Sequence, residues 1–323
     1  MNKEKLRVAV IGVGHLGEYH VQKYKDIPDV ELVGVVDINQ DRVSEISNRY
    51  HTRPFGHHEE ILGMVDAVSL AVPTETHFQV ARDVLSKGVH ILIEKPITYN
   101  LDHADSLLDL AREKALVLQV GLVERFNPAV VKMASLLNRP TFIEAHRMNL
   151  FTARGIDVDV VLDLMIHDLD IILHMVQAEV KEVHAVGMSV ITDKTDVANA
   201  RLIFENGIVA NLTASRVSIN TLRTIQVFQP DAHISADCHK RTISVVRLNG
   251  KAEGLKSPLQ FIPEREEFSN SDPLADEIVS FVRVVRNGSD PVVSGQDGRR
   301  ALNVALGIID QIEGGNKYFK SIS

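Results

Sequence analysis

A glycine motif close to the N-terminus constrains the fold of this chain more than any other feature. Gly12, Gly14 and Gly17 form the pattern G-x-G-x-x-G, which ends the apolar run Arg7–Gly12 and opens an amphipathic stretch. Between a strand and a helix, such glycines permit a tight turn, a close approach of backbone N–H groups to a pyrophosphate, and close helix–strand packing. The motif therefore predicts a dinucleotide-binding turn at the end of the first strand of a parallel sheet.

Strand-like and helix-like segments alternate on both sides of this motif. The stretches Thr76–Lys87 and Leu101–Lys114 carry apolar residues at helical spacing. The β-branched runs expected as strands are Arg7–Gly12, Glu31–Val36, Ala67–Val72, His90–Ile93 and Leu116–Val120. Because alternating strands and helices form parallel sheets, we expect an α/β domain of the doubly wound Rossmann type over residues 1–122.

The pattern changes in the second part of the chain. A strongly apolar helix is expected at Val158–Val176, and Asn206-Gly207 is typical of a hairpin turn. The runs expected as strands are Glu182–Val190, Ala198–Phe204, Ile208–Ser215, Arg223–Phe228 and Thr242–Leu248. After a polar loop, two helices at Pro273–Asn287 and Gln296–Glu313 end the chain. We expect an α+β domain over residues 123–323, with a mostly antiparallel sheet and helices beside it.

Composition excludes several classes of partner. The chain has 35 Lys and Arg against 43 Asp and Glu, a net charge of −8, which argues against nucleic acid or an anionic membrane surface. No apolar run is long enough to cross a membrane. Cys238 is the single cysteine, so the sequence predicts no disulfide and no zinc site, and we expect a cytoplasmic protein without a metal.

An acidic residue at the end of the second strand indicates the cofactor. Asp37 lies where a carboxylate accepts hydrogen bonds from the adenosine ribose of a dinucleotide, and it repels a 2′-phosphate. The next residues, Ile38 and Asn39, offer no cation to a phosphate. We therefore expect NAD rather than NADP, bound by the glycine motif together with His15 and Leu16 inside it.

Two further motifs carry groups suited to proton transfer. Glu94-Lys95-Pro96 closes the fourth strand, at the edge where doubly wound sheets bind ligands. Asp163 and His167 lie four residues apart on the apolar helix, hence on one face and one turn apart. The alternatives are a solvated lysine at a strand end and a core histidine satisfied by a neighbouring carboxylate.

Together these motifs resemble the Gfo/Idh/MocA oxidoreductases, a family named after glucose–fructose oxidoreductase and inositol dehydrogenase. The resemblance extends over nearly the whole chain and includes Pro73, Thr74 and His77 after the third strand. It implies NAD contacts from these three residues and from Glu94-Lys95-Pro96. It also implies a catalytic set of Lys95, Asp163 and His167, and a large open sheet in the domain 123–323, which binds substrate and forms oligomers. One departure is the run Asp159–Leu162, where the family usually has glycines.

Two passages are similar to a narrower branch, the UDP-N-acetylglucosamine 3-dehydrogenases. They are Val120–Ala129 and Leu162–Asp168. This similarity implies oxidation of the sugar C3 hydroxyl to a 3-keto sugar nucleotide, which an aminotransferase converts to the 3-amino sugar of a variant lipid A. The residues expected to bind the substrate are Arg125, Asn127, Arg147 and Arg154, with ordinary surface arginines as the alternative for the last two.

These residues allow two assignments of the catalytic base and two alternative functions. Either His167 or Lys95 is the base that takes the hydroxyl proton, and the sequence does not separate them. A first alternative is a dehydrogenase of a free polyol or sugar such as inositol, and a second is a non-catalytic NAD-binding sensor. An open sheet rich in Val, Ile and Thr predicts a homodimer or homotetramer.

Overall fold

The computed structural model describes residues 4–152, 158–247 and 263–320. The chain forms two compact units, Met1–Val123 with Asp272–Leu302, and Glu124–Ser271 with Asn303–Ser323. This division differs from the expected one in the segment 272–302, which groups with the first unit although the sequence placed it in the second domain. The division into functional domains stays a prediction.

The first unit contains a six-stranded sheet with the order β3-β2-β1-β4-β5-β6, and every pair of neighbours is parallel. The strands are β1 (Leu6–Ile11), β2 (Val30–Val36), β3 (Arg53–Phe55), β4 (Ala67–Leu70), β5 (His90–Glu94) and β6 (Leu118–Gly121). The order reverses between β1 and β4, which creates the switch point where doubly wound sheets bind ligands. This confirms the expected Rossmann topology; β3 is an additional strand that the sequence analysis did not predict.

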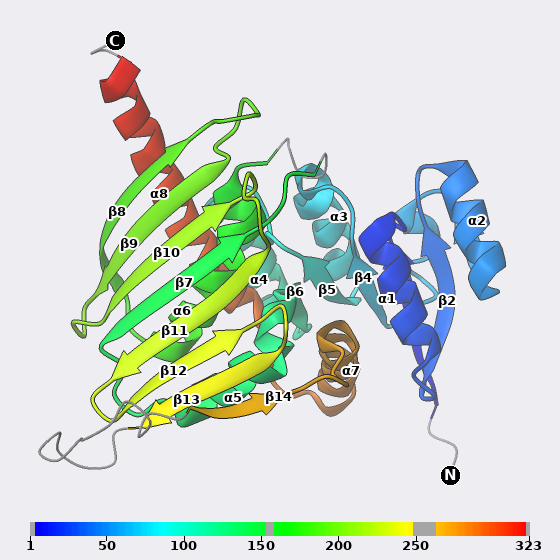
Figure 1. Ribbon diagram of the computed structural model, residues 1–323. Helices are drawn as coiled ribbons and strands as arrows, with labels where there is room; N and C mark the ends of the chain where they lie inside the picture. Colours follow the sequence, from blue (N-terminus) through cyan, green and yellow to red (C-terminus); the bar gives the residue numbers. More distant parts are fainter. Residues whose placement is uncertain (1–3, 153–157, 248–262, 321–323) are drawn as a thin grey trace, which may run out of the picture. The chain divides into compact units, whose positions relative to one another are not determined.

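Helices pack against this sheet (Figure 1). They are α1 (His15–Lys25), α2 (Gln40–Tyr50), α3 (Thr74–Ser86), α4 (Leu101–Glu113) and α7 (Pro273–Asn287), with the short 3₁₀ turn η1 (His58–Glu60). Helix α7 belongs to this unit because Ile278, Phe281 and Val282 are buried in the same apolar cluster as Val8 and Val10 of β1. Burial of such side chains is the main stabilising contribution in a domain core, so α7 is part of the first unit despite its distance in the sequence.

The second unit contains an eight-stranded sheet with the order β14-β13-β12-β11-β7-β10-β9-β8. Only β7 and β10 are parallel among its neighbouring pairs in the described residues. The strands are β7 (Phe142–Met148), β8 (Val180–Met188), β9 (Val197–Phe204), β10 (Val209–Ser215), β11 (Leu222–Gln229), β12 (Ala232–Asp237), β13 (Thr242–Arg247) and β14 (Glu264–Glu267). The expected large, mostly antiparallel sheet is confirmed, but the central strand β7 and strand β12 were not predicted.

Helices cover one face of this sheet (Figure 1). They are α5 (Pro128–Leu136) and α6 (Ile166–Val176), while the last helix, α8 (Gly295–Lys320), is divided between the two units after Leu302. Strand β7 shows how the faces differ, because Ile143 and Ala145 are buried whereas Glu144 and His146 are half-buried. Alternate residues of a strand point to opposite faces, so the second face of the sheet is the more accessible one.

Candidate active site and cofactor cradle

The glycine turn is shaped by three different constraints. Gly12 has φ +84°, and a Cβ there would lie 2.5 Å from the carbonyl oxygen of Ala71. A Cβ on Gly17 would overlap the carbonyl oxygen of Gly12, so helix α1 packs directly on the turn. No described atom lies within 4 Å of the Cβ position of Gly14, which begins α1 without a side-chain cap. Open space before uncapped helix amides is a suitable site for a pyrophosphate.

Asp37 lies directly after β2 and is fixed on this turn. Its Oδ2 accepts a hydrogen bond from the N–H of Val13 at 2.9 Å, and its Oδ1 accepts one from the N–H of Asn39 at 2.9 Å. Arg42 on α2 donates from Nε to the carbonyl of Val13 at 2.8 Å and from a terminal nitrogen to Glu18 at 2.6 Å. Arg42 already donates to the carbonyl of Val13 and to Glu18. The site around Asp37 therefore suits ribose hydroxyls better than a 2′-phosphate, which needs a cation.

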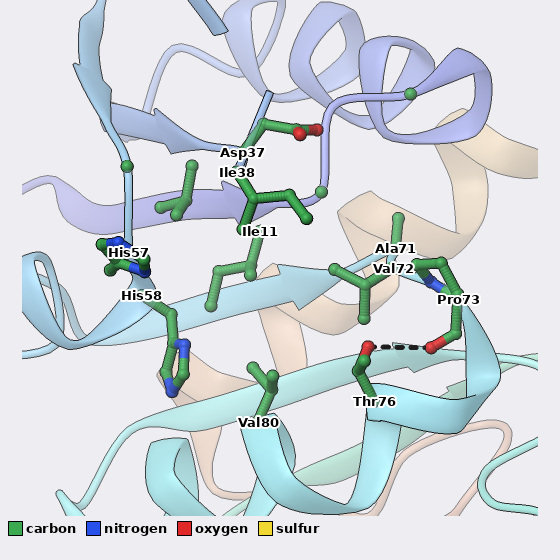
Figure 2. A pocket seen from close by; sticks show the side chains of 14 residues that line it. Ile11, Asp37, Ile38, His57, His58, Ala71, Val72, Pro73, Thr76 and Val80 are labelled. Carbon is green, nitrogen blue, oxygen red and sulfur yellow. Dashed lines mark hydrogen bonds between the residues drawn. The ribbon is translucent and has the colours of Figure 1, made fainter. Parts of the chain in front are cut away.

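A mainly apolar pocket of about 330 Å³ lies beside Asp37 (Figure 2). Its lining residues are Ile11, Gly12, Gly14, Val36, Asp37, Ile38, Gly56, His57, His58, Ala71, Val72, Pro73, Thr76 and Val80. An apolar slot next to an acid at the end of the second strand fits the adenosine half of a dinucleotide. The pocket contains Gly12, Gly14, Asp37 and Pro73, as expected from the sequence. The sequence analysis did not find His57, which follows β3, an edge strand too short to give a periodic signal.

Other expected cofactor contacts lie outside this pocket. His15 and Leu16 are exposed in the first turn of α1, and Thr74 begins α3. His77 is buried, with Nδ1 2.9 Å from the carbonyl oxygen of Pro96 and Nε2 3.0 Å from that of Val72. Burial lowers the pKa of His77, although the two carbonyls oppose that effect. His77 therefore connects the loops after β4 and β5, and its expected contact with the cofactor stays a prediction.

The motif Glu94-Lys95-Pro96 ends β5 at the carboxyl edge of the sheet, as expected. The side chain of Lys95 is half-buried, and its backbone N–H lies 3.3 Å from Oε2 of Glu94. Glu94 is buried, and its Oε1 lies 3.1 Å from Nε2 of His20 on α1. The sequence analysis gave no role to His20, because the contact joins residues on separate elements.

Asp163 and His167 lie on one continuous helical segment of the second unit. Residues Val161–Met165 form a turn of π-helix, η3, and α6 follows at Ile166. The turn is preceded by Asp159, whose Oδ1 accepts a hydrogen bond from the N–H of Val161 at 2.9 Å. Both Asp163 and His167 are half-buried. A π-turn changes the angular spacing that a regular helix gives to residues four apart, and such turns are frequent at functional sites.

Arg147 has a different environment from the expected one. It is buried on β7, donates to both carboxylate oxygens of Asp168 and donates to Oε1 of Glu124 at 2.8 Å. Burial would lower the pKa of Arg147, but Asp168 and Glu124 raise it well above its usual value, so the guanidinium stays charged. A buried guanidinium engaged by two carboxylates is part of the core of this unit, and the expected role of Arg147 as a ligand of the substrate diphosphate stays a prediction.

The remaining expected substrate residues follow the same trend. Arg125 is buried and donates to Asp170 at 3.1 Å. Asn127 is buried, caps α5 by accepting the N–H of Ala129 at 3.1 Å, and donates to the carbonyl of Cys238 at 2.9 Å. These contacts hold both residues within the second unit, and their expected roles in substrate binding stay predictions. Arg154 lies outside the described residues.

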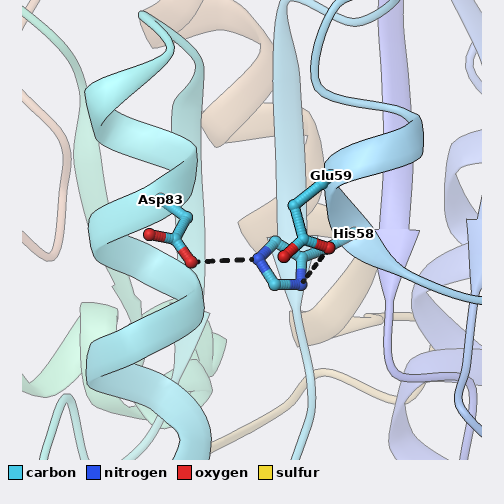
Figure 3. A group of neighbouring side chains, drawn as sticks. All are labelled: His58, Glu59 and Asp83. Carbon is cyan, nitrogen blue, oxygen red and sulfur yellow. Dashed lines mark hydrogen bonds and ion pairs between the residues drawn. The ribbon is translucent and has the colours of Figure 1, made fainter.

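His58 and two acids form a small cluster beside the pocket (Figure 3). Nε2 of His58 lies 3.2 Å from Asp83, and Nδ1 lies 3.6 Å from Glu59. The two carboxylates face opposite nitrogens of one ring, so hydrogen bonding and ion pairing account for the arrangement without an ion. In the parts of the chain that the structure describes, no helix combines the length and apolarity needed to span a membrane.

Comparison with known proteins assigns the family. Residues 6–122 match the model of an oxidoreductase family with an NAD-binding Rossmann fold, and residues 132–234 match the Gfo/Idh/MocA C-terminal domain. The chain belongs to the Gfo/Idh/MocA oxidoreductase family. This membership confirms the expected fold, the expected enzyme class and NAD as the cofactor.

Individual members of the family give further detail. The chain is 39% identical over 310 residues to UDP-N-acetylglucosamine 3-dehydrogenase of Acidithiobacillus ferrooxidans, covering 95% of this chain and 97% of that protein. It is 27% identical to myo-inositol 2-dehydrogenase of Thermotoga maritima, covering 92% and 93%. The solved structure of the Acidithiobacillus enzyme, GnnA, superposes with a TM-score of 0.89 at 38% identity, covering 97% of this chain and 99% of that one.

Proposed function

We propose that this protein is an NAD-dependent dehydrogenase that oxidises the C3 hydroxyl of UDP-N-acetylglucosamine to the 3-keto sugar nucleotide. The observation that carries the proposal is the 39% identity to a UDP-N-acetylglucosamine 3-dehydrogenase over 95% of this chain. The passages Val120–Ala129 and Leu162–Asp168, which resemble the same branch, also support it.

Three residues are assigned to the chemistry in this proposal. NAD, when bound, accepts the hydride that leaves the sugar carbon. His167 takes the hydroxyl proton, because an imidazole has an unperturbed pKa near neutrality. Lys95 donates a hydrogen bond to the same oxygen and stabilises its developing negative charge, and Asp163 orients a neighbouring hydroxyl or the imidazole. The reverse assignment, with Lys95 as the base, stays open.

Recognition of the substrate diphosphate requires a cation. Among the expected arginines, Arg147 and Arg125 are buried against Asp168 and Asp170, so Arg154 is the remaining candidate that we carry forward. A substitution of Arg154 by Gln should raise the KM for a nucleotide sugar and leave the affinity for NAD unchanged. An unchanged KM would assign the diphosphate to other donors.

We also propose the reaction that uses the product, the cellular compartment and the oligomeric state. The 3-keto product suits an aminotransferase that forms the 3-amino sugar of a variant lipid A. We place the enzyme in the cytoplasm, where UDP-sugars and NAD are available. The more accessible face of the eight-stranded sheet suits self-association, so we propose a homodimer or homotetramer.

A dehydrogenase of a free polyol is the second candidate. It is favoured by the 27% identity to myo-inositol 2-dehydrogenase of Thermotoga maritima over 92% of this chain. The two candidates differ in whether the enzyme needs the nucleotide part of the substrate.

One assay separates the two candidates. The purified protein is incubated with UDP-N-acetylglucosamine, NAD, glutamate and an aminotransferase specific for 3-keto sugar nucleotides, because alcohol oxidation by NAD accumulates little product by itself. The expected product is the 3-amino sugar nucleotide, identified by mass spectrometry. Absence of this product, together with rapid NAD reduction by myo-inositol or a free hexose, would replace the first proposal by the second.

A further inference from the structure

A buried histidine and a buried glutamate meet at the carboxyl edge of the parallel sheet. His20 of α1 is 0% exposed and Glu94 of β5 is 9% exposed. Nε2 of His20 lies 3.1 Å from Oε1 of Glu94. Nδ1 of His20 is buried and has no hydrogen-bond partner among the described residues. A buried ring nitrogen without a partner costs less free energy when it carries a lone pair than when it carries a hydrogen. We therefore assign the proton of His20 to Nε2, which donates to the Glu94 carboxylate.

A glycine on the next strand leaves room for the carboxylate. Gly121 ends β6 and is paired in register with Glu94. A Cβ at Gly121 would lie 2.8 to 2.9 Å from the carboxylate atoms of Glu94, closer than real Cβ contacts. Any side chain at this position would therefore displace the carboxylate. The glycine on β6 leaves the space that the Glu94 carboxylate occupies, and His20 on α1 and the backbone N–H of Lys95 hold the carboxylate there.

This position lies on the nicotinamide side of the cofactor cradle. The adenosine pocket is lined by the ends of β1 and β2 and by the segment after β4 with the start of α3, and the sheet continues beyond β4 through β5 to β6. A dinucleotide bound across the carboxyl ends of such a sheet spans the switch point between these two sides. Glu94 at the end of β5 and Gly121 at the end of β6 therefore belong to the half of the cradle that receives the nicotinamide.

We propose that His20 holds the Glu94 carboxylate beside the nicotinamide site, so that its negative charge favours the oxidised cofactor over the reduced one. The nicotinamide ring carries one positive charge in NAD⁺ and none in NADH, because the hydride brings two electrons with its proton. A fixed carboxylate in a partly buried site stabilises the charged ring and has little effect on the neutral one. Glu94 thereby acts on the redox preference of the site, and His20 is a positioning residue.

The inference uses the NAD site of the family fold and is independent of the proposed sugar substrate. The quantity to measure is the ratio of the Kd for NAD⁺ to the Kd for NADH, without any substrate. NADH is titrated by its fluorescence and NAD⁺ by competition with NADH. A wrong substrate assignment would leave this ratio unaffected, so the two proposals fail separately.

Removing the charge tests the role of Glu94 directly. We expect Glu94→Gln to raise the ratio roughly tenfold, the size of effect of one charge beside the ring in a partly solvated site. Glu94→Asp keeps the charge and should stay closer to the wild-type ratio than Glu94→Gln. A ratio for Glu94→Gln within a factor of two of wild type would overturn the proposal.

Three variants outside Glu94 test the positioning and remain informative if Glu94→Gln does not fold. His20→Leu removes the donor, whereas His20→Gln keeps an N–H near the place of Nε2. We expect the ratio to rise roughly threefold in His20→Leu and to stay near wild type in His20→Gln, because only the first leaves the carboxylate without its donor. Gly121→Ala should also raise the ratio of the Kd for NAD⁺ to the Kd for NADH, because the added Cβ would displace the Glu94 carboxylate.

Tyr24→Phe is the matched control. Tyr24 lies one turn after His20 on α1, and its hydroxyl makes a 2.8 Å hydrogen bond to Ser69 that is equally buried. Loss of this hydrogen bond loosens the packing of α1 but leaves the contact between His20 and Glu94 intact. The ratio of the two Kd values should therefore not change. An equal shift in Tyr24→Phe would assign the effect to general loosening of α1 and would overturn the role of the His20–Glu94 pair.

Discussion

The guanidinium of Arg147 donates hydrogen bonds to the carboxylate of Asp168, at 3.1 Å from Nε and 2.7 Å from a terminal nitrogen. Asp168 follows His167 directly, and Arg147 lies on the central strand β7. The same guanidinium also binds Glu124. This buried contact ties the start of α6 to the middle of the sheet, next to the residue proposed as the catalytic base.

Substitution of Arg147 should therefore act mainly on stability. Arg147→Met leaves two carboxylates buried without their cation, and we expect the free energy of unfolding to fall by about 3 to 5 kcal/mol. Urea denaturation followed by circular dichroism measures this loss. Arg201→Met, an exposed arginine on β9 of the same sheet, is the control and should change stability by less than about 0.5 kcal/mol. Equal free energies of unfolding for Arg147→Met and Arg201→Met would contradict the structural role of Arg147.

Asp37 should set the choice of cofactor. The wild-type protein is expected to bind NADH much more tightly than NADPH, because the carboxylate accepts from ribose hydroxyls and repels a 2′-phosphate. Asp37→Ser should weaken NADH binding by roughly tenfold, the usual scale for a hydrogen bond to a charged group, and narrow the difference from NADPH. Fluorescence titration measures both affinities, with Asp41→Ser on the first turn of α2 as the control. Tighter binding of NADPH by the wild type would refute this role of Asp37.

His167 and Lys95 should each be needed for turnover. His167→Asn and Lys95→Met are expected to lower kcat by about two to four orders of magnitude, the scale of a lost general base or of a lost donor to the reacting oxygen. NADH affinity should change little in His167→Asn. The control is His174→Asn, an exposed histidine further along α6, which should keep its activity. Near-wild-type turnover of either catalytic variant would assign that residue a structural role.

Asp196 should make the second unit sensitive to acid. Burial alone would raise the pKa of Asp196, but the backbone N–H groups of Thr192, Ile191 and Val190 lower it to about 2. Because the pKa in the folded state is below the unfolded value, the stabilisation is present at neutral pH and is lost as the pH falls toward 2. We expect Asp196→Asn to lower the free energy of unfolding by about 2 kcal/mol at pH 7.

The pH dependence of that difference is the test. Urea denaturation of wild type and Asp196→Asn is compared at pH 7 and pH 3, and the gap between them should shrink at the lower pH. Other carboxylates titrate equally in both proteins and cancel in the comparison. A gap that stays constant with pH would show that the hydrogen bonds of Asp196 do not depend on its charge.

Much of the fold could be predicted because its signals are local. The hairpin turn at Asn206-Gly207 needs a positive φ, and Gly207 has φ +84°. The start of α4 is capped by the side chain of Asn100, which accepts the N–H of His103. Strands β1, β2, β4 and β5 are buried and nearly continuous in apolar residues, so their sequence alone identifies them.

Strand β7 shows where local signals fail. It contains Glu144, His146 and Arg147, and the arginine lies on the buried face, which contradicts the usual pattern of a strand. Its burial is possible only because Glu124 and Asp168, from other elements, supply the opposite charges. The π-turn that carries Asp163 was missed for a related reason, since helical spacing in the sequence does not distinguish a π-turn from a regular turn.

The sequence by itself determined the glycine turn, the acid after β2 and the order of strands and helices, because each depends on neighbouring residues. Only the tertiary structure decided what Arg147, His20 and Glu94 do. His20 and Glu94 are 74 residues apart, and their contact exists because parallel strands and the helix between them bring distant segments to one edge of a sheet. Burial then makes each polar group depend on its partner, so the role of such a residue is set by the contact and not by its position in the sequence.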